Sequence, residues 1–353
     1  MSRADPPASA PAGLPLGADP SRPSEPLLRV RDLRVYFAGG DVLRRGQTGR
    51  GPLVRAVDGV SLEVARGATL GVVGESGCGK STLGRAILAL VPATSGEVRF
   101  DGRDVLAMRR RELRALRCRA QMVFQDPAGS LNPLMTIESA VGEPLLVQRL
   151  TRTRADRAAR VAAVLRRVGL DADAMPRYPH EFSGGQRQRI VIARALVLEP
   201  ELLVCDEPVS ALDVSIQAQI LNLLVELQVA GKLAYVFVSH NLAVVQHISD
   251  RVAVMYLGRI VETAPTAVLF RSPQHPYTHA LLAAAPEPDP AARPALALLR
   301  GEPPSPLNPP AGCAFHPRCP RAQERCRRDT PELSPASNTT PAHAVACFFP
   351  GSP

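Results

Sequence analysis

The sequence predicts an α/β fold with a parallel β-sheet at its core. Short apolar segments typical of strands alternate along the chain with longer segments that have the spacing of amphipathic helices. The segment from Glu201 to Cys205 is apolar after its first residue, as expected for a central strand covered on both faces. A glycine-rich loop, Gly74 to Ser81, joins the apolar strand Thr69 to Val73 to an amphipathic helix, and such strand–loop–helix units build parallel sheets.

The expected elements follow one another in a regular order. Strands are expected at 28–37, 57–64, 69–73, 97–100, 121–124, 201–205 and 233–238. Helices are expected at 82–90, 152–168, 186–198 and 214–229, and Gly169 closes the second of them. A Gly/Arg-rich insertion spans 38 to about 55. The stretch 126–183 is mainly helical, which predicts a helical subdomain that interrupts the sheet.

Composition limits the class of protein. The chain has 353 residues, of which 45% are hydrophobic, enough for one large domain and a smaller one. No apolar run approaches the roughly 18 residues of a membrane helix. The first 26 residues are rich in Pro, Ala and Ser and lack the apolar centre of a signal peptide. We therefore expect a soluble, cytosolic protein with a disordered tail at 1–26.

The net charge of +9 does not by itself predict nucleic-acid binding. The arginines are spread along the chain, with the densest stretch from Arg109 to Arg119, and only 4% of the residues are aromatic. We attribute the charge to a general preference for arginine and expect no nucleic-acid partner.

Against this preference, Lys80 is one of only two lysines in the chain. Lysine carries a compact ammonium on a flexible stem, which can reach the β- and γ-phosphates of a nucleotide. In the pattern G-x-x-x-x-G-K-S the glycines let backbone N–H groups close around phosphates at a helix start, and the serine hydroxyl can bind Mg²⁺. The nucleotide-binding residues predicted here are Gly74, Glu75, Ser76, Gly77, Cys78, Gly79, Lys80, Ser81 and Thr82.

Polar groups suited to the same chemistry follow three other predicted strands. Asp206 follows the strand at 201–205 and can hold Mg²⁺, and Glu207 can polarise an attacking water as a general base. Gln125 ends another strand and can coordinate Mg²⁺ or position water, with an ordinary surface glutamine as the alternative. His240 follows the strand at 233–238 and can hydrogen-bond the γ-phosphate.

A second anion site is predicted at Ser183, Gly184, Gly185 and Gln186, where a loop ends and a helix begins. Small residues at a helix start leave N–H groups able to bind an anion, and the Ser183 hydroxyl adds a donor. The chain thus carries two phosphate-binding segments but one set of catalytic groups.

The order of these motifs resembles that of the ATP-binding subunits of ATP-binding-cassette (ABC) transporters. The motifs CDEP at Cys205–Pro208 and SALD at Ser210–Asp213 complete the pattern. The resemblance implies a P-loop NTPase cassette at 27–270, with N-terminal antiparallel strands, a parallel-sheet core and a helical subdomain at about 126–183.

The resemblance also implies how the site is completed. ATP and Mg²⁺ are the implied ligands, and the SGGQ segment of one subunit caps the ATP bound by the other. Asp213 would act in communication across that interface. Tyr36 resembles the aromatic residue that stacks on adenine, with Phe37 and plain strand packing as alternatives.

Two further stretches resemble the oligopeptide/dipeptide importer branch: Asp126–Pro133, and His275–Thr278 followed by two leucines. On this basis we expect 271–349 to be a C-terminal region of importer type. The chain from about 28 to 349 resembles the second ATP-binding subunit of dipeptide permeases. Two positions depart from the pattern. Phe182 replaces a leucine before the SGGQ segment, and Asn241 replaces the acid usual after the histidine, which leaves the surroundings of that histidine open.

The branch implies an ATPase on the cytoplasmic face of the inner membrane, associated peripherally. Its implied partners are a second ATPase subunit, identical or sister, two transmembrane permease subunits and an extracytoplasmic solute-binding protein. Permease docking would use the surface near Gln125 and the helical subdomain. The implied cargo is dipeptides or oligopeptides. Nickel, glutathione or another solute are alternatives, and a soluble ABC ATPase is a more distant one.

Four of the seven cysteines fall late in the chain, at Cys313, Cys319, Cys326 and Cys347. The cytosol disfavours disulfides, and the spacing lacks the CxxC pair of common zinc sites. Four thiolates can hold a [4Fe–4S] cluster, and the pattern resembles the cysteine-bearing tail of peptide-importer subunits, some of which bind one. A cluster, zinc and unligated cysteines remain the three alternatives.

Overall fold

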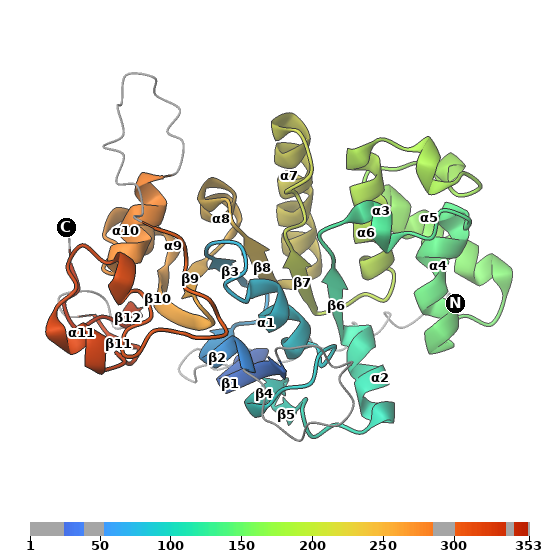
Figure 1. Cartoon of the computed structure of the whole chain (residues 1–353). Helices are drawn as coiled ribbons and strands as arrows, with labels where there is room; N and C mark the ends of the chain where they lie inside the picture. Colours follow the sequence, from blue (N-terminus) through green and yellow to red (C-terminus); the bar gives the residue numbers. More distant parts are fainter. Residues whose placement is uncertain (1–24, 39–52, 285–300, 337–341, 352–353) are drawn as a thin grey trace, which may run out of the picture.

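The computed structural model describes residues 25–38, 53–284, 301–336 and 342–351. The predicted tail lies outside the described residues up to residue 24, and so does the predicted insertion from 39 to 52. The described chain forms two sheets with helices around them (Figure 1). We call the part from residue 271 onward the C-terminal region.

The larger sheet confirms the predicted parallel core. Its first five strands pair in parallel and its last three add antiparallel pairs. In spatial order the strands are β6 (Ala120–Val123), β7 (Leu202–Asp206), β8 (Ala234–Ser239), β3 (Thr69–Val73), β9 (Arg251–Tyr256), β10 (Arg259–Pro265), β12 (Ala344–Val345) and β11 (Ser334–Pro335).

The smaller sheet is antiparallel, as predicted for the N-terminal strands. Its spatial order is β2 (Leu53–Val64), β1 (Leu28–Ala38), β4 (Ser95–Phe100) and β5 (Arg103–Asp104). Strand β2 begins before the predicted position, so residues 53–55 belong to a strand rather than to the insertion. Helix α1 (Lys80–Ile87) lies between the two sheets, where Leu83 and Ile87 are fully buried.

The remaining helices lie beside the larger sheet, in the helical subdomain or in the C-terminal region. After α2 (Arg110–Arg119), the predicted helical subdomain consists of α3 (Pro127–Ser130), α4 (Ile137–Gln148) and α5 (Arg154–Arg167) with two short 3₁₀ helices. Gly169 follows α5 at a φ of 74°, as predicted for a helix-closing glycine. The later helices are α6 (Gly184–Leu196), α7 (Val214–Gly231), α8 (Leu242–Ile248), α9 (Thr266–Arg271), α10 (Pro276–Ala283) and α11 (Glu324–Arg328).

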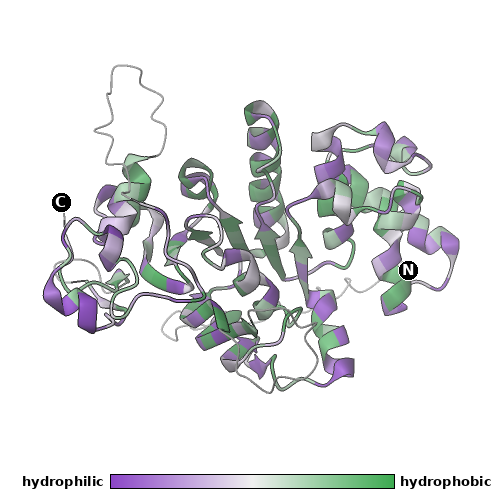
Figure 2. Ribbon diagram, in the orientation of Figure 1, coloured by the Kyte–Doolittle hydropathy of each residue, from purple (hydrophilic) through white to green (hydrophobic). Residues whose placement is uncertain are grey.

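Hydrophobic side chains form one core on each face of the larger sheet. One core lies between the two sheets around α1, and the other lies under α6, α7 and α8 and extends into the helical subdomain. Figure 2 shows that the central strands are mainly hydrophobic, whereas outer helices such as α2 carry polar faces. Alternate residues of β3, β7 and β8 serve the two cores, because successive side chains of a strand point to opposite faces.

Helix α7 is the one described helix that is long and apolar enough to cross a membrane by length and composition. Its 18 residues have a mean hydropathy of 1.2. Its apolar face, including Ile220 and Leu224, is buried in the core. The Tyr235 hydroxyl of β8 donates to the Leu224 carbonyl at 2.9 Å. The buried apolar face of α7 therefore packs in the core on one face of the larger sheet.

The C-terminal region joins the cassette through the sheet itself. Strand β12 pairs with β10, so the larger sheet continues into this region. Fully buried Glu262 of β10 accepts hydrogen bonds from the N–H groups of Gln274 and His275 at 2.7 and 2.9 Å, and it contacts His343 Nε2 at 2.7 Å. One carboxylate thus ties three segments together. The division of the chain near residue 270 stays a prediction.

We predict that Glu262→Leu lowers the free energy of unfolding by about 3 kcal/mol, because it leaves the N–H groups of Gln274 and His275 and the buried side chain of His343 without their acceptor. Urea denaturation measures the change. Glu324→Ala is the control, since Glu324 pairs with Arg328 on the surface and its removal should cost less than about 1 kcal/mol. Equal losses for the two variants would contradict the assigned role of Glu262.

Candidate functional site

The register of the parallel strands brings the predicted motifs to one edge of the larger sheet. Val73 at the end of β3 pairs with Ser239 at the end of β8. Asp206, the last residue of β7, pairs with Val238, and β6 ends beside β7. The glycine-rich loop and the three segments that follow β6, β7 and β8 therefore leave the sheet side by side.

Two glycines of the loop lie where no side chain fits. A Cβ atom at Gly74 would lie 2.1 Å from the Met255 carbonyl oxygen, and one at Gly79 would lie 1.9 Å from the Ala56 carbonyl oxygen. Both residues have positive φ, 155° and 106°. Gly77 also has positive φ, but a Cβ atom there would meet nothing within 4 Å. The loop backbone is thus pressed between β2 and β9.

Lys80 is buried and folds back along the loop. Its Nζ donates to the carbonyl oxygens of Gly74 and Glu75 at 2.7 and 2.9 Å. The thiol of Cys78 lies 3.8 Å from the same ammonium, and burial raises the pKa of this thiol. The ammonium is therefore held within the loop, at the start of α1, where an anion is favoured.

Asp206 and the serine that follows Lys80 form a pair of oxygen groups. The Ser81 hydroxyl donates to Asp206 Oδ1 at 2.7 Å, and Asp206 is almost fully buried. Burial raises the pKa of Asp206, while the hydrogen bond from Ser81 lowers it. Hard oxygen ligands such as these fit Mg²⁺. Arg85 of α1 lies 4.0 Å from Asp206 and was not predicted from the sequence.

The three predicted catalytic groups meet at one carboxylate oxygen. Glu207 Oε2 lies 3.0 Å from Gln125 Nε2, which donates to it, and 3.1 Å from His240 Nδ1. Glu207 has a φ of 48°, in the left-handed region that few non-glycine residues adopt. The sharp backbone turn after β7 directs this side chain toward the ends of the neighbouring strands. A carboxylate so placed can accept a proton from water.

The second predicted anion segment forms the start of α6. The Ser183 hydroxyl accepts from the Gln186 N–H at 3.3 Å, and the Gln186 side chain accepts from the Ser183 N–H at 3.0 Å. A Cβ atom at Gly185 would lie 2.5 Å from the side chain of Ile216 in α7, so a larger residue there would require Ile216 to move. Ser183 is exposed, and no hydrogen bond between described residues joins Ser183–Gln186 to the glycine-rich loop. Asp213 precedes α7 and is exposed as well.

Tyr36 of β1 is held by its hydroxyl. It donates to Asp58 Oδ1 at 2.5 Å, and Asp58 also accepts from the Arg259 guanidinium at 2.7 and 3.0 Å. Burial raises the pKa of Tyr36 to about 12, with a further contribution from the bond to Asp58. The Arg55 guanidinium lies 5.9 Å from the ring centre, and neighbouring Phe37 is exposed.

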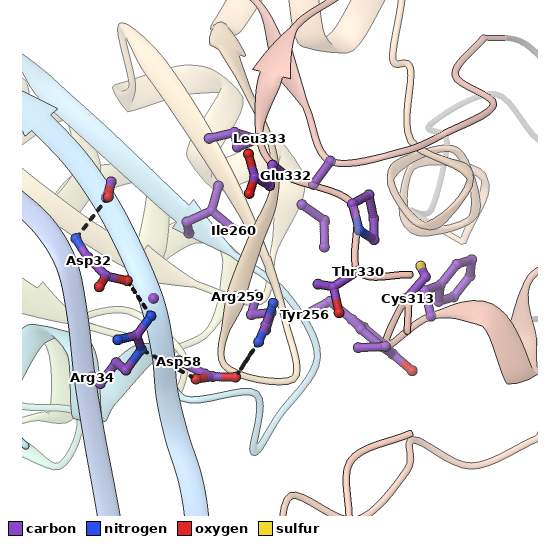
Figure 3. A pocket seen from close by; sticks show the side chains of 17 residues that line it. Asp32, Arg34, Asp58, Tyr256, Arg259, Ile260, Cys313, Thr330, Glu332 and Leu333 are labelled. Carbon is purple, nitrogen blue, oxygen red and sulfur yellow. Dashed lines mark hydrogen bonds and ion pairs between the residues drawn. The ribbon is translucent and has the colours of Figure 1, made fainter. Parts of the chain in front are cut away.

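A cavity of about 510 Å³ lies between the smaller sheet and the C-terminal region. Figure 3 shows Asp58 between Arg34 and Arg259 on one side, with Thr330 and Glu332 on the other. A second cavity of about 580 Å³ lies along Arg55, Asp58, Arg259 and residues 306–312. The C-terminal region therefore borders the part of the cassette that holds Tyr36.

The four late cysteines line one small cavity of about 10 Å³, close to the roughly 10–15 Å³ that a single water needs. Burial raises the pKa of Cys313 to about 11 and raises those of Cys319 and Cys347. The Phe349 N–H donates to Cys347 Sγ at 3.4 Å. Among the described residues, no three His, Cys, Asp or Glu side chains are arranged to hold a metal ion.

The fold and this site define a P-loop nucleotide-binding protein, and comparison with known proteins narrows the class. Residues 57–210 match the model of the ABC transporter family, and residues 261–326 match that of the oligopeptide/dipeptide transporter C-terminal region. The chain is 56% identical to the probable peptide ABC transporter ATP-binding protein of Sinorhizobium fredii, over 84% of this chain and 83% of that protein. It is 52% identical to the oligopeptide transport ATP-binding protein OppF of Salmonella typhimurium, over 91% and 96%.

Solved structures agree with this result. A dimeric ATP-binding cassette bound to ADP and phosphate matches with a TM-score of 0.60 and 27% identity, over 68% of this chain and 98% of that chain. A cassette from Clostridium perfringens, part of an ABC transporter complex, has the same TM-score and identity, over 70% and 91%. The chain belongs to the family of ABC transporter ATP-binding proteins, in its oligopeptide/dipeptide branch. It is therefore an ATPase of the ABC class.

Sequence reasoning missed contacts that reach the loop from the C-terminal region. The Glu75 N–H donates to the Tyr277 hydroxyl at 2.9 Å, and the Glu75 carboxylate accepts two hydrogen bonds from Arg318, at 2.7 and 3.0 Å. Tyr277 lies in the His-Pro-Tyr-Thr motif, which marked the branch but gave no sign of this contact. No local pattern pairs Glu75 with Arg318.

We predict that Gly79→Ala destabilises the protein far more than Gly77→Ala. Both substitutions cost about 1–2 kcal/mol for an alanine at positive φ, but only the first also places a Cβ against a backbone oxygen, that of Ala56. Thermal unfolding by calorimetry compares the two variants. Similar melting temperatures would show that the loop is not pressed against β2.

Proposed function

We propose that this chain hydrolyses ATP to power the import of dipeptides or oligopeptides across the cytoplasmic membrane. The observation that carries the proposal is the similarity to an oligopeptide transport ATP-binding protein over 91% of the chain, C-terminal region included. The match of residues 261–326 to the oligopeptide/dipeptide C-terminal model supports the same cargo. The chain would act on the cytoplasmic face, with two permease subunits and an extracytoplasmic binding protein.

The glycine-rich loop would hold the phosphates of ATP. The Lys80 ammonium is held within this loop at the start of α1, where the N–H groups of a helix favour an anion. Ser81 and Asp206, joined at 2.7 Å, would hold Mg²⁺ together with Gln125. The ion, when bound, supplies charge neutralisation to the phosphates. Tyr36, fixed through its hydroxyl, would present its ring to adenine.

Glu207 would act as the general base. Its Oε2 is within hydrogen-bond reach of both Gln125 and His240, so the two side chains hold the carboxylate in one orientation. A water between Glu207 and the γ-phosphate would lose a proton to the carboxylate as it attacks phosphorus. His240 would keep the carboxylate and the γ-phosphate in line, because it follows the strand next to β7.

A second ATPase subunit would complete the site. Ser183 is exposed and the two glycines after it are half-buried, and reciprocal bonds between Ser183 and Gln186 orient the start of α6. No bond between described residues joins them to the loop of the same chain. The related cassette that forms a dimer with bound ADP and phosphate supports the pairing of two subunits. Exposed Asp213 would lie at the same interface.

A groove between β6 and α4 would receive the permease. It has a volume of about 360 Å³ and is lined by apolar residues that are partly exposed, among them Leu90, Phe124 and Val147. Phe124 directly precedes Gln125, so a permease segment seated here would contact the chain next to a group that bonds Glu207. Such a position would let the permease sense the nucleotide.

The four late cysteines would hold a [4Fe–4S] cluster in an arrangement that differs from the one described, in which no three of the described His, Cys, Asp or Glu side chains are placed to hold a metal ion. Their thiols line one cavity, and a backbone N–H donates to one of the sulfurs, as is common around such clusters. We expect anaerobically purified protein to be brown, with iron and sulfide, and Cys313→Ser to lose the colour. Cys118→Ser in α2 is the matched control and should keep it. Colourless, iron-free protein would refute the cluster, and zinc in its place would support the alternative metal.

Uptake of labelled dipeptides tests the cargo. Cells lacking the gene should lose uptake, the normal gene should restore it, and Glu207→Gln should not. In the purified variant we expect ATP binding to persist while hydrolysis falls about 10²- to 10³-fold, because a glutamine cannot take the proton. If deletion spared peptide uptake but abolished that of nickel or glutathione, the peptide assignment would be wrong. Normal turnover by Glu207→Gln would remove Glu207 from the role of base.

A further inference from the structure

We propose that Arg318 and Tyr277 of the C-terminal region are positioning residues of the ATP site, which hold Glu75 of the glycine-rich loop and keep its charge away from the phosphates. The proposal rests on ATP binding, which the family membership establishes, and not on the proposed cargo. It makes the C-terminal region a part of the nucleotide site.

The contact is direct and has a defined geometry. Arg318 lies in a short 3₁₀ helix, His316–Arg318, and its Nη1 and Nη2 donate to the two carboxylate oxygens of Glu75 at 2.7 and 3.0 Å. The side chain of Arg318 is only 5% exposed and that of Glu75 is 25% exposed. A two-pronged bond of this kind fixes orientation as well as distance.

Tyr277 holds the backbone of the same residue. Its hydroxyl accepts from the Glu75 N–H at 2.9 Å, so Glu75 is held at its main chain and at its side chain. Tyr277 is fully buried in an aromatic cluster, with ring centres 4.7 Å from Tyr256 and 5.5 Å from Phe315. The Arg318 guanidinium lies 6.0 Å from the Tyr256 ring centre. The cluster therefore places both partners of Glu75.

Electrostatics explain why Glu75 needs such a partner. A carboxylate in a loop that binds the phosphates of ATP brings a like charge next to the ligand. Burial and, to a smaller extent, Glu75 itself raise the pKa of the Cys78 thiol, so the field of this carboxylate reaches the middle of the loop. Pairing with Arg318 neutralises the carboxylate and turns it toward the C-terminal region.

The carbonyl of Glu75 adds a second consequence. Lys80 Nζ donates to this carbonyl at 2.9 Å. The residue held by Arg318 and Tyr277 is thus also one of the two that hold the Lys80 ammonium. A shift of Glu75 would move both a negative charge and the acceptor of the lysine that the phosphates require.

Steady-state ATP hydrolysis and ADP binding by the purified full chain test the proposal. Arg318→Ala should raise KM for ATP and the Kd for MgADP about tenfold, with little change in kcat, because it weakens binding without touching Glu207. Arg318→Lys should show a smaller increase, since one ammonium replaces two parallel bonds. The double variant Glu75→Gln with Arg318→Ala should regain most of the affinity, because the unpaired charge is gone.

Arg325→Ala is the control within the C-terminal region. Arg325 pairs with Asp329 on the surface of α11 and contacts Phe348, so its loss perturbs the region without reaching the loop. This variant should keep the KM and Kd of the normal chain. Unchanged affinity in Arg318→Ala, or failure of the double variant to regain it while its melting temperature matches that of Arg318→Ala, would overturn the proposal. These readouts need no peptide, so they stand apart from the uptake test.

Discussion

The parallel register of β6, β7, β8 and β3 is the constraint on which the site depends. It brings residues from four distant parts of the chain to one edge, and it fixes which face each residue meets. Because side chains alternate along a strand, a slip of one residue in β7 would turn Asp206 away from Ser81 and move Glu207 away from Gln125 and His240. The wholly buried sequence of β7 resists such a slip, since both of its faces are packed.

Much of this arrangement could be predicted because its signals are local. The glycines and lysine of the loop, the acids after β7, and the residues that end β6 and β8 all follow apolar runs, and the structure brings them together. The rule that parallel strands end at one edge of the sheet was enough to predict the positions of Asp206 and Glu207. The class of protein followed from the order of these motifs.

The elements that escaped prediction depend on distant partners. Strands β11 and β12 have two residues each and exist only because β12 pairs with β10. Strands β9 and β10 meet at Leu257 and Gly258, a tight turn with both residues at positive φ. Glycine is common in such a turn, but a leucine before it does not predict one from the sequence.

The contact between Glu75 and Arg318 joins positions that lie 243 residues apart in the chain. Replacing Arg318 alone leaves the partly buried carboxylate of Glu75 without this pairing. We therefore expect the two positions to change together during evolution. Among relatives, a neutral residue in the second position of the loop should accompany the loss of this arginine, and truncation of the C-terminal region should be accompanied by the same change. Substitutions in the glycine-rich loop should in this way depend on residues near the other end of the chain.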